Sequence, residues 1–193
     1  STRSRDDIVS QFASQVTSVG TNFNSFRDLE TVREYVTKVA EASKSTRIVM
    51  YDHALESELF PSRLDFGELE IAKKTELPRE QFFAALKTAD IGISPVNLAV
   101  AESGTLIIVT SDESERLATA LPRIHVAVLP RSRLVASFRD AQPTIFQELS
   151  RTGGVVVSLI SATSRTSDIA HLLVMGVHGP KELHICMVDQ EFS

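Results

Sequence analysis

Three short segments of the chain carry residue types that do acid, base or anion chemistry. "AESGTL" places Glu102 two residues before Gly104, "SRTSDI" groups hydroxyls around Arg165, and "GVHGPKELH" sets His178 between two glycines. A carboxylate, a guanidinium and an imidazole brought to one place can bind a small anion and exchange a proton with it. These segments are therefore the first candidates for a site.

The first segment adjoins an apolar run that begins at Thr105. Gly104 would let the backbone bend there or let a ligand approach closely. Glu102 could then act as an acid, a base or a hydroxyl acceptor at the mouth of a strand. The alternative is a simple turn, in which the glutamate is solvated or holds a neighbouring backbone amide.

The second segment is rich in residues that favour a helix start. Ser164, Thr166, Ser167 and Asp168 are good N-caps, so we expect a helix to begin here. Its first N–H groups, together with Arg165, could hold a phosphate or a carboxylate. The alternative is that the hydroxyls only cap the helix while Arg165 pairs with Asp168 or another acid.

The third segment predicts a defined turn. Gly176 and Gly179 permit a positive φ and Pro180 fixes φ, which would hold His178 in place to bind an anion or move a proton. A turn histidine that only hydrogen-bonds a carbonyl is the alternative. Since His178 and His184 have no third ligand at suitable spacing, we expect no metal site.

These segments must be positioned by regular elements, and the N-terminal part favours helices. Ile8, Phe12 and Val16 have helical spacing and Gly20 stands where that helix would end. Ser25 and Asp28 have the spacing of a capping box before a second apolar face. Strands are expected at 47–51 and 69–74, and Pro78 can open a third helix at its first position.

From residue 90 the pattern changes to apolar runs typical of strands: 104–110, 125–130, 155–161 and 183–188. Their nearly continuous hydrophobicity predicts burial on both faces. A helical pattern formed by Leu134, Val135, Phe138 and Ala141 suggests a crossover, with Pro143 ending or kinking that helix or opening another. We predict an α/β fold, a layered sheet with flanking helices.

The whole chain, residues 1–193, is expected to form one domain, because its length suits a single core. Residues 1–45 would be an N-terminal helical part and residues 46–193 the α/β core. If the strand ending near Ser161 and the turn at 176–180 open on the same edge of the sheet, the hydroxyls, Arg165 and His178 converge on one anion, with Glu102 at the rim. Arg116, in "ERLATALPRIHV", lies on a short helix before a turn and is free to pair with an acid.

Composition excludes several classes of protein. The chain is 42% hydrophobic and 23% charged, as in globular proteins, and no stretch approaches the roughly 18 apolar residues of a membrane helix. "STRSRDDIVS" has no apolar region typical of a secretion signal, so we expect a cytoplasmic location. A net charge of −5 without a dense basic stripe argues against nucleic-acid binding.

Cys186 is the only cysteine, and it stands within an apolar run where a free thiol behaves as a small buried hydrophobe. One thiol cannot hold an ordinary iron–sulfur cluster or a cysteine-rich zinc site. We therefore expect no cofactor on this chain, and any redox metal must be carried by a partner. A P-loop, a GxGxxG fingerprint and a GxSxG elbow are also absent from the sequence.

Four motifs taken in order, "AESGTL", "RLATALPRIHVAVL", "SRTSDI" and "GVHGPKELHICMV", resemble the lactate-utilisation protein C (LutC/YkgG) family of LUD-domain proteins. The resemblance implies a layered α/β fold of the broad group that includes CoA-transferases, sugar-phosphate isomerases and formyltetrahydrofolate cyclo-ligase. It also implies family-like positions, which are Glu102, Gly104, Thr105, Arg116, Pro122, His125, Ser164, Arg165, Thr166, Asp168, Gly176, His178, Gly179 and Pro180. Of these, we expect Gly104, Thr105, Arg116, Ser164, Arg165, Thr166, Asp168, His178 and Gly179 to bind ligand, with Glu102 and His178 the catalytic candidates.

What the resemblance implies for function is participation in the oxidation of L-lactate to pyruvate, beside partner subunits that carry iron–sulfur clusters. This chain would be a component without redox clusters that binds a small anion or organises its partners. The alternative is an independent enzyme or sensor acting on a small anion, by analogy with the isomerases and cyclo-ligases. Where this family commonly reads SGPSRTADIE, this chain has Ala162, Thr163 and Ala170 in place of Gly, Pro and Glu.

Overall fold

The structure of the chain, a computed structural model, describes residues 4–62, 64–151, 156–161, 165–167, 173–175 and 179–192. The helices are α1 Arg5–Ser18, α2 Leu29–Ser43, α3 His53–Leu59, α4 Arg79–Thr88, α5 Glu113–Ala120, the 3₁₀ helix η1 Arg131–Arg133 and α6 Phe138–Arg151. The strands are β1 Asn22–Phe26, β2 Arg47–Met50, β3 Glu70–Lys73, β4 Ile91–Pro95, β5 Leu98–Val100, β6 Thr105–Thr110, β7 Ile124–Pro130, β8 Leu134–Val135, β9 Val156–Ile160, β10 Arg165–Ser167, β11 Leu173–Met175 and β12 Glu182–Val188.

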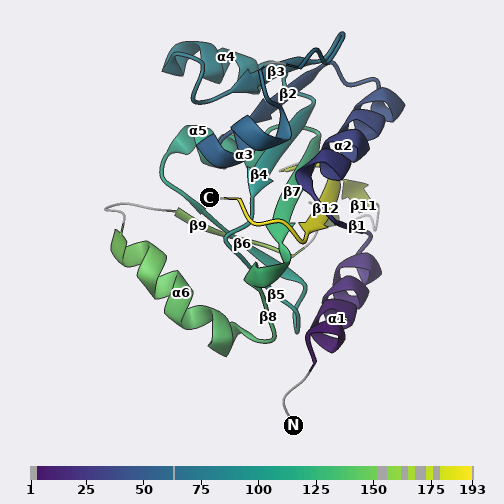
Figure 1. Cartoon of the computed structure of the whole chain (residues 1–193), viewed down its shortest axis with the longest axis vertical. Coiled ribbons are helices and arrows are strands. Elements are labelled where there is room, and N and C mark those ends of the chain that lie inside the picture. The colour runs from purple at the N-terminus through teal and green to yellow at the C-terminus, as the bar shows by residue number, and fades with distance from the viewer. Residues whose placement is uncertain are drawn as a thin grey trace.

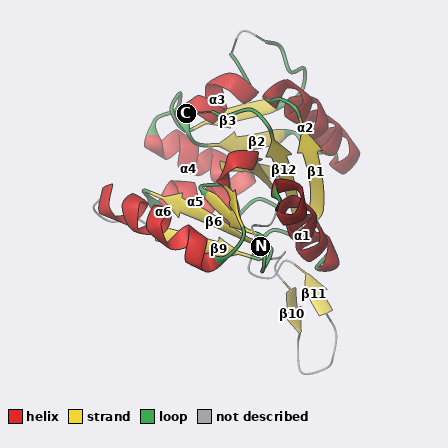
Figure 2. Ribbon diagram, turned by 60° about the horizontal axis from the view of Figure 1, so that its bottom comes forward, coloured by secondary structure: helices red, strands yellow, loops and turns green. Residues whose placement is uncertain are grey.

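Six of these strands form a parallel sheet in the order β1-β12-β7-β4-β2-β3. α2 and α3 cover one face of this sheet, and α4 and α5 cover part of the other face (Figure 1). In the view of Figure 2, α3 and α4 lie on opposite sides of β2 and β3. The chain therefore changes faces between the β2–β3 and the β3–β4 connections, which makes the carboxyl ends of these strands the expected place for a ligand.

A second sheet has the order β8-β5-β6-β9 and packs against β7 and β12 of the parallel sheet. α1 shares this core through Phe12 and Val16, and α6 packs on the opposite face of the second sheet through Ala141. β10 and β11 pair with each other, antiparallel. The α/β fold with flanking helices is thus confirmed, in a form with two larger sheets and the two-stranded β10–β11 pair.

Helix starts follow local capping rules. Asp28, Asp52 and Asp112 each accept a hydrogen bond from the backbone N–H three residues later, at the starts of α2, α3 and α5. At α1, Ser4 and Asp7 form a reciprocal capping box. Gly20, with φ of 81°, follows the end of α1 as expected.

The N-terminal part differs from the expectation for residues 1–45. Two helices are present, but β1 lies between them and pairs in parallel with β12, so this segment belongs to the main sheet. The predicted capping pair was wrong, because Ser25 is a strand residue and Asp28 itself caps α2. The "NFNSF" run was missed because it buries little of its own surface and depends on the distant β12 for its hydrogen bonds.

Further along, the strands expected at 47–51, 69–74, 104–110, 125–130, 155–161 and 183–188 are confirmed as β2, β3, β6, β7, β9 and β12. β7 is buried along its whole length, but β9 is not buried on both faces: Val156 is 47% and Leu159 59% exposed. It pairs with β6 on one side, so one flank lies toward solvent. Hydrophobicity alone does not separate a central strand from an outer one.

The expected helical face at 134–141 is only partly correct. Leu134 and Val135 form β8, and α6 begins at Phe138 and continues past Pro143. Proline six positions into the helix lacks the N–H that would bond to the carbonyl of residue 139, but it neither ends the helix nor opens another. Pro78, expected at the first position of the third helix, is instead the N-cap of α4.

Candidate functional site

Glu102 lies in the turn between β5 and β6 and is exposed. Its Oε1 accepts a hydrogen bond of 2.8 Å from the backbone N–H of Phe138, and its own N–H donates to the carbonyl of Ala136. Glu102 thus ties the β5–β6 turn to the start of α6. This corresponds to the structural alternative, a turn glutamate that holds a neighbouring backbone amide.

Gly104 adopts a positive φ of 65°, as a sharp turn requires. The close approach that it permits is to helix α1, because a Cβ on Gly104 would stand 3.0 Å from the Cβ of Gln15 and 3.2 Å from Cγ1 of Val16. The predicted need for glycine is therefore satisfied by packing between elements of this chain.

Next to the turn, hydroxyls link the two antiparallel strands of the second sheet. Thr105 is buried, accepts a hydrogen bond from Ser103, and lies 2.9 Å from the hydroxyl of Ser161. Ser161 directly follows β9 and is the first residue of the "SATSRTSD" segment. The "AESGTL" turn and the start of that segment are thus brought together.

The remainder of the predicted anion site is only partly described. Arg165 and Thr166 lie in β10, paired with Met175 and Val174, so the helix start predicted here is wrong for residues 165–167; residues 168–172 lie outside the described residues. A strand forms because the segment finds a β partner in 173–175, and N-cap propensity is too weak to override such a pairing. Ser164, Asp168, Gly176 and His178 lie outside the described residues, and Gly179 comes just before β12. Their convergence on one anion stays a prediction.

Arg116 is exposed on α5, and no ion pair joins it to an acid among the residues that the structure describes. Nothing places Arg116 beside the hydroxyls of Thr105 and Ser161. The expected turn at Pro122, which connects α5 to β7, is present.

Two histidines are held inside the parallel sheet. His125 Nε2 lies 2.8 Å from the hydroxyl of Ser94, and burial, helped by the nearby His184, lowers the pKa of His125 to about 4. His184 Nδ1 lies 2.8 Å from the hydroxyl of Tyr35, and burial also lowers the pKa of His184. Both rings are therefore neutral at pH 7, as core histidines that hydrogen-bond to hydroxyls.

The carboxyl ends of β2 and β3 carry a polar cleft that the sequence did not reveal. Its volume is about 410 Å³, and its walls come from α3, the loop after α3 and the segment after β3. They are formed by His53, Glu56, Ser57, Pro61, Ser62, Lys73, Thr75 and Glu76. The turn into α3 is strained, since Asp52 has a φ of 94°, a value that favours glycine. A signal did exist: these residues follow strands predicted as 47–51 and 69–74, at the end where parallel sheets bind ligands.

Two ionisable side chains in this cleft are almost fully buried. Glu56 is 1% exposed and accepts hydrogen bonds from the hydroxyl and the backbone N–H of Thr75; burial raises the pKa of its carboxyl group. The side chain of Lys73 is 5% exposed, and its Nζ donates to Ser62 Oγ at 2.8 Å and to Glu76 Oε1 at 2.9 Å. The cleft thus offers both a buried acceptor and a buried donor.

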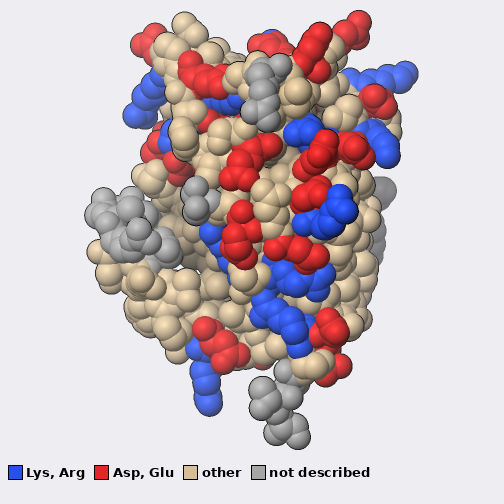
Figure 3. Space-filling view, in the orientation of Figure 1, with Lys and Arg blue, Asp and Glu red and all other residues tan. Residues whose placement is uncertain are grey.

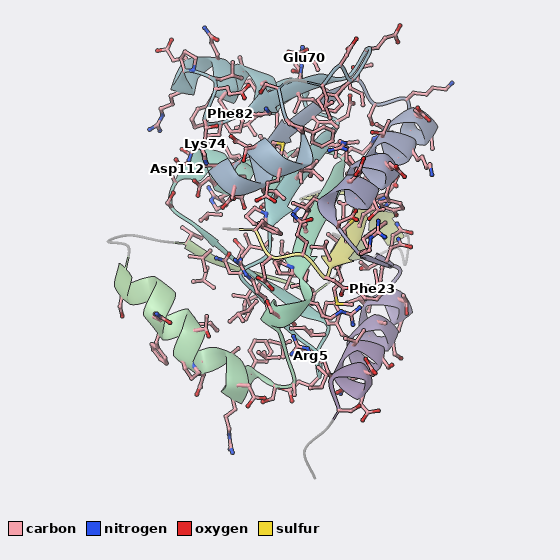
Figure 4. The ribbon with its side chains drawn as sticks, in the orientation of Figure 1. Arg5, Phe23, Glu70, Lys74, Phe82 and Asp112 are labelled. Carbon is pink, nitrogen blue, oxygen red and sulfur yellow. The ribbon has the colours of Figure 1, made fainter. Side chains whose placement is uncertain are left out.

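The next residue, Lys74, points to the other face of the sheet and pairs with α5. Its Nζ lies 2.6 Å from Asp112 and 2.5 Å from Glu115 (Figure 4). Burial opposes charge on both partners, but the hydrogen bonds outweigh it: they raise the pKa of Lys74 and lower that of Asp112 to about 2. This network fastens the start of α5 to the end of β3.

The described residues offer neither a metal-binding cluster nor a membrane-spanning helix. In the part of the chain that is described, no three His, Cys, Asp or Glu side chains are grouped so that they could hold a metal ion. Within the same residues, none of the helices has both the length and the apolar character needed to cross a membrane. On the face shown in Figure 3, basic and acidic side chains are interspersed.

Comparisons with known proteins agree with the fold. A model of the LUD domain family matches residues 9–188. "Lactate utilization protein C" of Halalkalibacterium halodurans is 28% identical over 92% of this chain and 77% of its own length, and that of Shouchella clausii is 36% identical over 53% of this chain and 45% of its own. The region matched thus spans about half the length of the second protein.

Similarity extends to a second kind of protein and to a solved structure. "Lactate utilization protein B" of a Geobacillus species (strain WCH70) is 34% identical over 61% of this chain, which is 25% of that protein. A crystal structure of a DUF162 family protein from Deinococcus radiodurans matches 96% of this chain and 99% of its own with a TM-score of 0.63. At 17% identity, that match concerns the fold alone.

Proposed function

Since the chain belongs to the LUD domain family, we propose that it is a component of a system that oxidises L-lactate to pyruvate. The observation that carries this proposal is the similarity to a lactate utilization protein C over 92% of the chain. In this role the chain carries no redox centre of its own. It binds a small carboxylate or holds partner subunits together.

The partners in this proposal are proteins that carry iron–sulfur clusters. Similarity to proteins named lactate utilization protein B supports a system of several proteins. The chain has one cysteine, Cys186, which is buried in β12, and burial raises the pKa of its thiol well above the usual range. A single buried thiol cannot supply the thiolates of a cluster, so electron transfer falls to the partners.

The site proposed for the carboxylate is the one predicted from "SRTSDI" and "GVHGPKELH". The hydrogen bond between Thr105 and Ser161 supports it, because it anchors Ser161, three residues before the first of these segments, beside the "AESGTL" turn. Arg165 provides a two-pronged contact to the carboxylate, and His178 donates a hydrogen bond. Glu102 takes no part, because its carboxylate already holds the start of α6.

The proposed role is tested in the source organism. Deleting the gene should abolish growth on L-lactate as sole carbon source, and affinity capture of the chain should recover partners that together oxidise L-lactate. The purified chain should be colourless and inactive alone. Normal growth of the deletion strain on lactate, or a bound flavin or cluster in the purified chain, would contradict the proposal.

The proposed site is tested by calorimetry with L-lactate, pyruvate and phosphate. Arg165→Ala and His178→Ala should each weaken binding about ten- to a hundred-fold, since each removes a charged or charge-assisted hydrogen bond. Glu102→Gln, outside the site, is the matched control and should bind normally. Equal affinity in the wild type and the three variants would contradict the proposal that Arg165 and His178 bind the anion.

A further inference from the structure

A second site is indicated by the cleft at the carboxyl ends of β2 and β3, on the face of the sheet that α3 covers (Figure 1). A volume of about 410 Å³ is in the range of small-molecule sites. The chain changes faces of the sheet at this point, between α3 and α4, and open α/β sheets bind ligands at such positions. Neither the predicted anion site nor the proposed lactate role uses this cleft.

Two buried charges of opposite sign line the cleft, and they do not pair with each other. Lys73 forms its ion pair with Glu76, while Glu56 is held by Thr75. No ion pair joins Glu56 to Lys73 or to any other cation among the residues that the structure describes. A carboxylate buried without a cation is costly, so a ligand that brings a cation here would be stabilised.

The charge balance of the cleft defines the ligand. Lys73 is in contact with Glu76, and its charge acts on Glu56 only from a distance. Burial of Glu56 outweighs this attraction and raises the pKa of its carboxyl group, so Glu56 is the charge that lacks a cation in contact with it among the described residues. An ammonium group satisfies it, because it donates up to three hydrogen bonds. Lys73 Nζ uses two donors, to Ser62 and Glu76, and has a third to offer an acceptor. The hydroxyls of Ser57 and Ser62 already donate to the carbonyl of Ala54 and to Glu76, so Lys73 is the donor that a ligand would meet.

We propose that this cleft binds a small zwitterion that carries a primary ammonium and a carboxylate, such as an α-amino acid, with the ammonium at Glu56 and the carboxylate toward Lys73. A simple hydroxy acid fits less well, because it has no cation for Glu56 and brings a net negative charge beside Glu56 and Glu76. L-Alanine and L-lactate differ only in an ammonium and a hydroxyl at the α-carbon. They are therefore a matched pair of probes for this site.

The binding test uses the whole ¹⁵N-labelled chain and NMR, with each of the twenty standard amino acids and L-lactate as probes up to 50 mM, on the order expected for weak ligands. At least one amino acid should cause saturable shifts of the backbone amides of Ser62 and Thr75, and it should bind at least about ten-fold more tightly than L-lactate at these amides. The proposal is overturned if no amino acid saturates these shifts, or if L-lactate binds here as tightly as the best amino acid.

Variants then assign the two ends. Glu56→Gln keeps the shape of the side chain and an oxygen for Thr75 but removes the charge. The affinity for the amino acid should fall about ten- to a hundred-fold. Lys73→Met should lower the affinity for the amino acid by a similar factor. Glu58→Gln, on an exposed residue of the same helix outside the cleft, is the control and should leave binding unchanged. If Glu56→Gln does not fold, the shifts in the wild-type chain decide the question.

The same experiment separates this proposal from the lactate role. Growth on lactate depends on the whole system, whereas amide shifts at Ser62 and Thr75 report on this cleft alone. A deletion strain that grows normally on lactate leaves the cleft proposal intact. Absence of amino-acid binding leaves the lactate role intact.

Discussion

The two ends of the parallel sheet are built on different principles. At the amino end, Gly92 lies under α5 and His125 is buried and uncharged; in the second sheet, Gly104 lies equally close to α1. At the carboxyl end, ionisable side chains gather, with Glu56 and Lys73 in a cleft and Lys74 paired to α5. The amino end therefore carries stability, and the carboxyl end has the chemistry to bind a ligand.

This difference follows from the direction of the strands. All neighbouring strands of the sheet are parallel, so all the loops that leave a strand meet at one end and all those that enter a strand meet at the other. β1, β2, β4 and β7 are each entered from a helix a few residues earlier, and such a helix must dock closely, as α5, which leads into β7, does on β4. Leaving segments begin new loops whose side chains are free to gather.

Gly92→Ala should produce the largest effect, and it tests the close packing of the amino end. A Cβ on Gly92 would stand 1.9 Å from the carbonyl oxygen of Ala118, so α5 must move. We expect a loss of more than about 3 kcal/mol in the free energy of unfolding, or failure to fold. Urea unfolding measures it, and a loss below about 1 kcal/mol would show that α5 is not tightly docked.

Acidification should produce the next largest effect, through His125. The folded-state pKa, about 4, is below the unfolded value of 6.5, so the unfolded chain binds a proton first. Stability is therefore full above about pH 6.5 and falls as the pH drops toward 4, by about 3 kcal/mol from this group.

His125→Gln serves as the control for that pH dependence, because glutamine can still hydrogen-bond to Ser94 but does not titrate. Unfolding measured in urea at pH 7.5 and pH 4.5 should show a smaller acid loss in this variant. The wild type and the variant also share every other titrating group. An identical pH dependence of the two proteins would mean that His125 is not buried as described.

Gly104→Val should cost about 2 to 3 kcal/mol, since it combines a positive φ with contact to α1. Gly67→Val is the matched control: Gly67 has a similar φ of 61° but nothing within 4 Å of its Cβ position. Gly67→Val should lose only the free energy of unfolding that comes from placing valine at a positive φ, about 1 to 2 kcal/mol. Thermal or urea unfolding compares them, and equal losses would show that α1 does not press on Gly104.

The smallest effect is expected at the carboxyl end, from Asp112→Asn. Asparagine still caps α5, and Lys74 keeps its contact with Glu115, so the loss should be about 1 kcal/mol or less in this partly exposed pair. Asp112→Ala, which also removes the cap, should lose about 1 kcal/mol more. If both variants lose more than Gly92→Ala, the carboxyl end carries the stability and the comparison is reversed.

Much of the fold could be predicted from local patterns. The runs at 104–110, 125–130 and 183–188 are confirmed as strands, because a central strand buries nearly every side chain and its sequence shows it. The ends of α1 and α5 were also evident, since Gly20 and Pro122 mark them by backbone geometry. The ordered motifs that indicated the LUD family likewise lie in the sequence itself.

The sites were less accessible to prediction. Glu102 was singled out as a catalytic candidate and Gly104 as a ligand-binding one, whereas in the structure Glu102 holds the start of α6 and Gly104 lies against α1. Glu102 contacts a residue more than 30 positions away, and Gly104 contacts residues about 90 positions away. No local sequence pattern contains contacts of that separation. A glycine in a turn has the same sequence signature whether a helix or a ligand lies against it.

By itself, then, the sequence determined the fold class, most of the strands and the family. Burial produces runs and periodic patterns of hydrophobic residues, and backbone geometry selects particular residue types at turns and helix ends. Only the tertiary structure decided which charges meet. Lys73 and Lys74 are neighbours in the chain, yet the alternation of a strand directs one into a cleft with Glu76 and the other across the sheet to Asp112. Glu56, by type a surface residue, is buried because Thr75 arrives from another loop to hold it. Such meetings depend on how distant segments pack, and the free energy of a buried charge is set by those neighbours.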